Sequence, residues 1–183
     1  MTQQTDWRVW VRTTTAMPHG APDKLVHLPV DLPPQDVWRS VDGTLLRAYE
    51  GGSKRPGATW QQLQLLQAIA GASATSMAPF HYVVETDVLP EHANALTDWY
   101  TKEHLPGLAA VPGTVRAARY LRLDGAPRFY ACYDLMSLET LRSEAWLAVR
   151  HTEWSSRVRP LFRNTRRTEF VRAGGADHTG ATG

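Results

Sequence analysis

The stretch WYTKEHLP, Trp99 to Pro106, decides how the second half of the chain is expected to fold. Residues four apart on a helix are neighbours on its surface, so Tyr100 and His104 are expected to share one face, and Trp99 and Glu103 an adjacent one. Because proline restricts the residue before it, Pro106 is expected to end the helix. The cluster is either a site or an ordinary helix end, where a histidine is favourable for capping and dipole reasons alone.

The segments on both sides of this helix predict an α+β domain. Pro112-Gly113 turns the chain into a strand, and Asp124-Gly125 predicts a hairpin to the next one. Alternating or apolar stretches predict four strands, and helical periodicity with the N-cap Ser137 predicts helices between them. The strands are expected over 80–88, 114–123, 128–135 and 166–172, and the helices over 90–105, 137–150 and 153–162. This order is the ferredoxin-like βαββαβ arrangement with an antiparallel sheet.

The first part of the chain has a different texture. Residues 7–12 and 37–49 predict strands, and the proline-rich segment 16–36 between them is expected to be loop or extended. Thr59 is a plausible N-cap for a helix over 60–70, with Gly71 as its C′ residue. We therefore divide the chain into an N-terminal half or arm over 1–79, a ferredoxin-like domain over 80–172 and a disordered tail over 173–183.

Residues 80–172 resemble the dimeric α/β-barrel superfamily of ferredoxin-like domains, and within it the EthD-like and REDY-like group. The resemblance is carried by a Tyr-x-x-x-His-x-Pro helix end and two flanking pieces: Tyr100, His104, Pro106, Val111-Pro112-Gly113 and Trp154-Ser155. It implies two sheets that face one another around a cavity, the second sheet coming from a homodimer partner or from a tandem repeat. Residues 1–79 favour a degenerate repeat within one chain, and the alternative is an arm on a true homodimer.

The superfamily hosts many activities, so the fold alone does not give a function. Its members include polyketide cyclases, muconolactone-type isomerases, haem-degrading and quinol-forming monooxygenases and dye-decolorising peroxidases. The candidate chemistry must therefore come from particular side chains.

Two groups of side chains are candidates for acid–base catalysis. On the first strand of the domain, the apolar alternate residues are expected to pack on the helices, so His81 and Glu85 point into the cavity and form an acid–base pair. His104 is a candidate acid or base, oriented by Glu103 or Tyr100. The alternatives are that His81 and Glu85 satisfy neighbouring polar groups or arginines of the facing sheet, and that the His104 segment only defines the helix end.

A second set is expected to bind substrate. Arg119 lies on the strand face opposite Arg116 and Arg122, and an arginine there can hold a carboxylate with two hydrogen bonds. The other candidates are aromatic or lie between two helical pieces: Trp99, Tyr120, Tyr130, His151 and Trp154. Core packing and ordinary ion pairing are the alternatives.

The composition narrows the functional class. The net charge is +2 and no basic run occurs, so a nucleic-acid partner is not expected. The single cysteine, Cys132, excludes an intrachain disulfide and a cysteine-based zinc site. No signal peptide and no membrane-length apolar run is present, so we expect a soluble, cytoplasmic protein without metal or cofactor.

These observations favour a cofactor-independent small-molecule enzyme. It would act as an isomerase, cyclase or lyase by acid–base chemistry on an apolar aromatic or polyketide-like carbonyl substrate held in a barrel cavity. The alternatives are a non-catalytic small-molecule-binding accessory protein and a monooxygenase of the same superfamily.

Overall fold

The sheet of the protein closes into a barrel within one chain. In the computed structural model, which describes residues 8–15, 37–52 and 57–173, the strand order around the barrel is β1-β3-β2-β8-β5-β7-β6-β4, and all neighbours are antiparallel. The strands are β1 Arg8–Thr15, β2 Val37–Ser40, β3 Leu45–Gly51, β4 Gln61–Ala70, β5 Phe80–Asp87, β6 Thr114–Arg122, β7 Phe129–Leu135 and β8 Arg163–Arg172. The expected tail beyond residue 173 and the proline-rich segment 16–36 lie outside the described residues.

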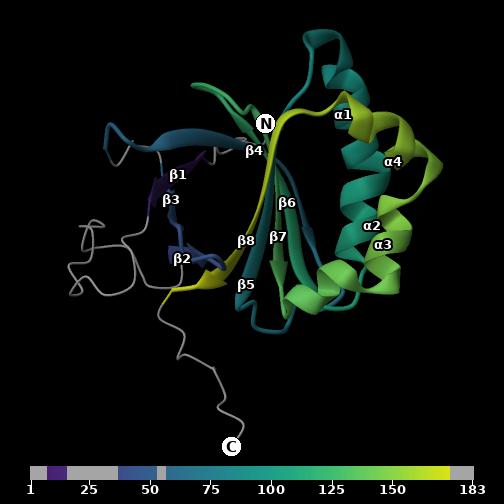
Figure 1. Ribbon diagram of the computed structural model, residues 1–183, viewed down its shortest axis with the longest axis horizontal. Coiled ribbons are helices and arrows are strands. Elements are labelled where there is room, and N and C mark those ends of the chain that lie inside the picture. The colour runs from purple at the N-terminus through teal and green to yellow at the C-terminus, as the bar shows by residue number, and fades with distance from the viewer. Residues whose placement is uncertain (1–7, 16–36, 53–56, 174–183) are drawn as a thin grey trace, which may run out of the picture.

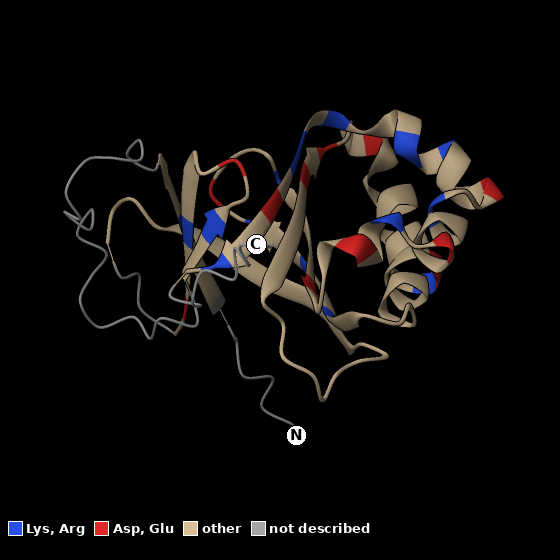
Figure 2. Cartoon of the chain, turned by 60° about the horizontal axis from the view of Figure 1, so that its bottom comes forward, with Lys and Arg blue, Asp and Glu red and all other residues tan. Residues whose placement is uncertain are grey.

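Strands β5 to β8 and their helices form the ferredoxin-like unit that the sequence predicts. The first connection holds a short turn Pro90–His92, α1 Ala93–Trp99, a π-helical turn Tyr100–His104 and α2 Leu105–Ala109. The second holds a 3-10 turn Leu138–Arg142, α3 Glu144–Arg150, α4 Glu153–Val158 and a turn Arg159–Leu161. Figure 1 shows α1–α4 in one layer against the β5–β8 side, with β1–β3 on the opposite side of the barrel. Figure 2 shows basic and acidic residues scattered over this helical layer, most of which is uncharged.

The prediction that Pro106 ends the helix is wrong. Helix α2 continues to Ala109, and Pro106 lies in its first turn, where the missing N–H is tolerated. The preceding π-helical turn bonds the Leu105 N–H to the carbonyl of Tyr100, five residues back. The chain turns only at Gly113, whose φ of 94° is in the left-handed region that favours glycine.

The predicted helix over 60–70 is also wrong, because this segment is strand β4. It pairs with β1 on one side and β6 on the other, and its burial alternates with a period of two. Gly71 is not a helix C′ residue. It donates its N–H to the Val115 carbonyl, and an added Cβ there would lie 2.0 Å from the Thr114 carbonyl oxygen. Closing the barrel therefore overrides the helical spacing of this segment.

The β5–β8 sheet separates two cores. On its helix face Val84, Ala131 and Tyr133 pack with residues of the helices, and on the lumen face Val83, Cys132 and their neighbours pack with β1, β2 and β4. This confirms the predicted division of β5 into a helix face and a cavity face. Cys132 is buried on the lumen face of β7. Among the described residues, no helix is both long enough and apolar enough to cross a membrane.

Candidate functional site

Two hollows flank the β5–β8 sheet, one on each face. The helix-side pocket, of about 30 Å³, lies between the helices and the sheet and includes Trp99, Tyr100 and His104. The barrel cavity, of about 380 Å³, lies in the lumen and includes His81. The predicted acid–base residues are thus divided by the sheet, and His104 does not meet His81 and Glu85 in one cavity.

The π-helical turn gives His104 its surroundings. It places Trp99, five residues earlier, parallel to the imidazole with ring centroids 4.1 Å apart, and Tyr100 edge-on at 5.4 Å. His104 is only 7% exposed, and its Nδ1 has no hydrogen-bond partner. Glu103 points elsewhere and accepts a hydrogen bond of 2.6 Å from the Thr152 hydroxyl. Tyr100 and His104 therefore share one face as predicted, whereas Trp99 pairs with His104 rather than with Glu103.

The electrostatics of the pocket keep His104 neutral. Burial lowers the pKa of His104 to about 3, and the positive charges of Arg150 and Arg159 act in the same direction. The imidazole therefore has one nitrogen that is neither charged nor hydrogen-bonded at ordinary pH.

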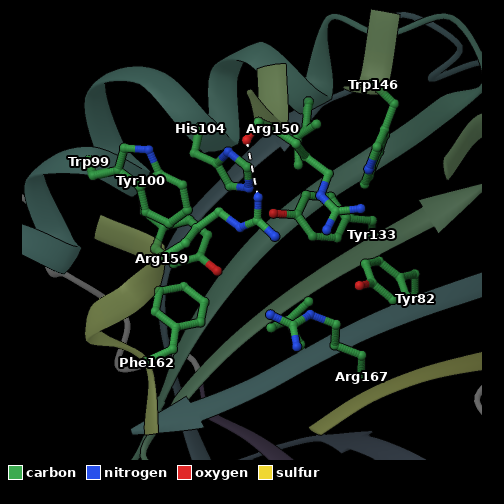
Figure 3. A pocket seen from close by; sticks show the side chains of 12 residues that line it. Tyr82, Trp99, Tyr100, His104, Tyr133, Trp146, Arg150, Arg159, Phe162 and Arg167 are labelled. Carbon is green, nitrogen blue, oxygen red and sulfur yellow. Dashed lines mark hydrogen bonds between the residues drawn. The ribbon is translucent and has the colours of Figure 1, made fainter. Parts of the chain in front are cut away.

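Arginine and tyrosine side chains without a carboxylate partner line the pocket around this imidazole. Arg150, Arg159 and Arg167 line the pocket, and within the described ranges no carboxylate forms an ion pair with any of them. Figure 3 shows their guanidinium groups pointing into the space below His104, where Arg159 donates to the Arg150 carbonyl at 3.3 Å. The Tyr133 hydroxyl is buried without a partner, and burial raises its pKa well above the usual value. The pocket is therefore suited to a negatively charged or electron-rich oxygen.

An adjacent hollow enlarges the space available to a ligand. It has a volume of about 170 Å³ and shares Tyr82, Trp146 and Arg150 with the helix-side pocket. Tyr82 and Trp146 meet edge to face, with centroids 6.4 Å apart. Arg150, which lines both, is half-buried, and Arg167 of the helix-side pocket is exposed, so part of this space borders the surface.

The other residues predicted on this side have mostly structural positions. Arg119 faces the helices, opposite Arg116 as predicted, with its guanidinium 4.5 Å above the Tyr100 ring. Trp154 is half-buried against the helix-side core, and His151 is exposed at the C-cap of α3. His151 and Trp154 line neither the helix-side pocket nor the barrel cavity.

In the barrel cavity His81 is hydrogen-bonded at both ring nitrogens. Its Nδ1 lies 2.7 Å from the Asp134 carboxylate and its Nε2 lies 2.9 Å from the Tyr49 hydroxyl. Burial alone would raise the pKa of Asp134, but His81 and two arginines lower it overall, so the carboxylate is ionised and accepts. Nδ1 therefore donates to Asp134, and in the neutral imidazole Nε2 accepts from Tyr49. We call this Tyr49–His81–Asp134 chain the relay.

Glu85 is not the partner of His81. It is 3% exposed and forms an ion pair of 3.0 Å with Arg47 of β3, with Arg166 at 3.6 Å. This is the alternative that pairs Glu85 with an arginine of the facing sheet. Tyr120 and Tyr130 both face the lumen core, where burial raises the pKa of each to about 12.

Sequence reasoning missed part of both hollows. Asp134 shares the lumen face with Cys132, so alternation along β7 was a usable signal for its direction. No local pattern pairs it with His81 or Tyr49, because those contacts depend on the register of separate strands. The arginines around His104 come from α3, the turn after α4 and β8, so their meeting is a property of the tertiary fold.

Comparison with known proteins identifies relatives of the fold. No protein-family model and no curated protein matches the chain. A ferredoxin-fold protein of Listeria monocytogenes, described as related to antibiotic biosynthesis monooxygenases, is 14% identical with a TM-score of 0.63, over 92% of this chain and 95% of that one. A haem-degrading enzyme of Listeria monocytogenes is 12% identical with a TM-score of 0.57, over 88% and 98%. An anthrone oxidase-like protein is 15% identical with a TM-score of 0.61, over 98% of both chains. These similarities establish the α+β ferredoxin-like barrel fold.

Proposed function

We propose that the protein is a small-molecule enzyme that moves a proton to or from an aromatic or polyketide-like carbonyl compound, held in the helix-side pocket and the adjacent hollow. The observation that carries this proposal is the buried, neutral His104 with a free Nδ1, facing three guanidinium groups that have no described carboxylate partner. Isomerisation, cyclisation and lyase steps through an enolate all use such an arrangement.

The proposed step removes a proton from the carbon next to the substrate carbonyl. His104 accepts that proton on the nitrogen that carries the lone pair, and the C–H electron pair becomes part of an enolate. Arg150, Arg159 and the Tyr133 hydroxyl stabilise the negative charge that develops on the enolate oxygen. The same guanidinium groups disfavour protonation of His104 in the free protein, and the enolate charge offsets this effect as it forms.

Two further observations support the proposal. Tyr100, His104 and Pro106 match the helix end of the EthD-like group, and in this fold they place the imidazole between helix and sheet. Strands β1–β4 close the barrel, which supports residues 1–79 as a degenerate repeat in place of a second subunit. A homodimer remains a separate proposal, and size-exclusion chromatography with light scattering tests it.

The second candidate is a cofactor-independent monooxygenase, favoured by the descriptions of the structural relatives. Here the carbanion would react with O₂, so that a CH₂ group becomes a carbonyl and the other oxygen atom leaves as water. A haem-dependent reaction fits less well, because the helix-side pocket and the adjacent hollow, of about 30 and 170 Å³, are together too small for a porphyrin.

Anthrone in D₂O distinguishes these functions, because its CH₂ protons are acidic and the product of its oxidation has a distinct near-ultraviolet absorption. Deuterium incorporation beyond the buffer rate without O₂ uptake supports proton transfer, and O₂ uptake with anthraquinone formation supports the monooxygenase. Saturable quenching of tryptophan fluorescence without either reaction indicates an accessory binding protein. A Soret band in the purified protein would contradict both cofactor-independent proposals.

Variants of two histidines test the role of His104. His104→Gln is expected to reduce turnover by about 10²-fold or more, the usual range for a general base. The matched control is His92→Gln, because His92 lies in the turn before α1 and lines neither hollow. Turnover that survives His104→Gln at the wild-type rate would overturn the mechanism.

A further inference from the structure

The barrel cavity has the size and lining of a small-molecule site of its own. Its volume of about 380 Å³ falls in the range of ligand pockets. Trp38 on β2 and Tyr120 on β6 both line it, and their strands are four positions apart in the eight-stranded order. Trp38 and Tyr120 therefore lie on opposite sides of the lumen. The Trp38 ring already stacks on His81, with centroids 4.8 Å apart, and lies under the Arg172 guanidinium, so a ligand in the lumen meets its edge.

The mouth of this cavity holds an arginine with spare hydrogen-bonding capacity. Arg116 donates to the Tyr120 hydroxyl at 3.3 Å and lies 3.9 Å from the Asp134 carboxylate, so both contacts are long. A guanidinium has five N–H donors, and the Arg116 side chain is 45% exposed. It is therefore accessible to a ligand, and a ligand carboxylate could form two parallel hydrogen bonds with it.

An entry path reaches the same residues from outside. A further hollow, of about 500 Å³, lies next to the barrel cavity and shares Arg116, Asp134 and Arg172 with it. Arg172 is already engaged, with its guanidinium 4.2 Å above the Trp38 ring and its donors on the Ala78 carbonyl. Arg116 is thus the better anchor for an incoming anion.

The relay supplies a second polar contact inside the lumen. In the neutral His81 imidazole the proton lies on Nδ1 toward the ionised Asp134, so the Tyr49 hydroxyl donates to Nε2 and its oxygen, which also faces the Arg47 guanidinium, can accept. Tyr49 lines the cavity. A ligand with a hydroxyl group therefore finds an acceptor within the lumen, whereas Arg116 supplies donors at the mouth.

We propose that the barrel interior is a second small-molecule site, separate from the helix-side pocket, that binds a monocyclic aromatic acid. Arg116 holds the carboxylate at the mouth, the ring lies between Tyr120 and the edge of the Trp38 ring, and a para hydroxyl group donates to Tyr49. The β5–β8 sheet separates this site from His104, so binding in the lumen does not depend on the proposed proton transfer.

Isothermal titration calorimetry with 4-bromobenzoate tests whether Arg116 binds the carboxylate of the ligand. Arg116→Gln is expected to weaken this binding roughly tenfold or more, while the control Arg128→Gln, at an exposed position at the hairpin, leaves it unchanged. The neutral 4-bromobenzamide has no carboxylate, so we expect it to bind weakly and with equal affinity to Arg116→Gln and Arg128→Gln. Thermal unfolding verifies that wild type and Arg116→Gln are both folded. If both then bind 4-bromobenzoate with equal affinity, the proposal is overturned.

Crystals grown with 4-bromobenzoate locate the ligand by the anomalous signal of bromine. A peak in the lumen that is lost in Arg116→Gln supports the proposal. A peak only beside His104 contradicts it and leaves the proposed function of the helix-side pocket intact. Tyr49→Phe provides a second check, because it is expected to remove the affinity advantage of 4-hydroxybenzoate over benzoate without weakening benzoate itself.

Discussion

On the helix face of the β5–β8 sheet His104 has an unpaired nitrogen beside arginines, whereas on the lumen face His81 is hydrogen-bonded at both nitrogens. Both imidazoles are buried, with exposed fractions of 7% and 5%. The difference lies in what the surrounding strands and helices supply: guanidinium groups in one case, and a carboxylate and a hydroxyl in the other. Burial alone therefore does not determine what a histidine can do, and the charge of its neighbours does.

The largest effect is expected from the buried ion pair of the lumen. Glu85→Ala leaves the Arg47 guanidinium buried without its carboxylate, so the free energy of unfolding should fall by about 3–5 kcal/mol. Urea denaturation measures this loss. The double variant Arg47→Met/Glu85→Leu should recover most of the stability, and a double variant no more stable than Glu85→Ala would show that the cost does not come from the unpaired charge.

The next largest effect is the pH dependence of stability that we expect from His104 on the helix face of the sheet. The folded-state pKa of His104, about 3, lies below its ordinary value of 6.5, so the unfolded chain binds the proton more readily. Stability is therefore complete above pH 6.5 and falls between pH 6.5 and 3, with a loss of about 2 kcal/mol by pH 5. Unfolding free energies of wild type and His104→Gln at pH 7 and pH 5 measure it. The variant should lack this slope, and equal slopes would refute the assignment.

The smallest effect concerns the relay on the lumen face. Asp134 has a lowered pKa, so its contribution is present above the ordinary value of 3.8 and is lost as pH falls below it, which overlaps only the acidic end of the His104 window. Asp134→Asn should cost about 1 kcal/mol at pH 7, because a charge-assisted hydrogen bond becomes a neutral one. Thermal unfolding of the variant at pH 7 and below pH 4 checks both statements. A wild type and variant of equal stability at pH 7 would contradict the role of the charge.

The sequence predicted the second half of the fold better than the first. Alternation on β5 and β7 gave both strands and their faces, and Ser137 and the Asp124-Gly125 hairpin marked the boundaries correctly. Strand β4 was predicted to be a helix because of the spacing of Trp60, Leu63 and the Leu65-Leu66-Ile69 group. Its strand pairing comes from β1 and β6, which are distant in sequence.

The site was predicted in its residue types but not in its pairings. His81, Glu85 and His104 are buried, and the first two face the lumen as the alternation predicted. Their partners Asp134, Arg47 and Trp99 were not foreseen. The first two depend on strand register across the barrel, and the last depends on a π-helical turn that shifts the neighbour of His104 from four residues to five.

That π-helical turn has the geometry left by one extra residue in a regular helix. Each residue of an α-helix advances the chain by about 100°, so deleting one residue within 100–103 would rotate α1 relative to α2 by that angle. Trp99 would leave the face of the imidazole and turn toward another side of the helix. A single insertion or deletion in this turn therefore changes the rotation of α1 relative to α2 about the helix axis. That rotation determines which side chain covers His104.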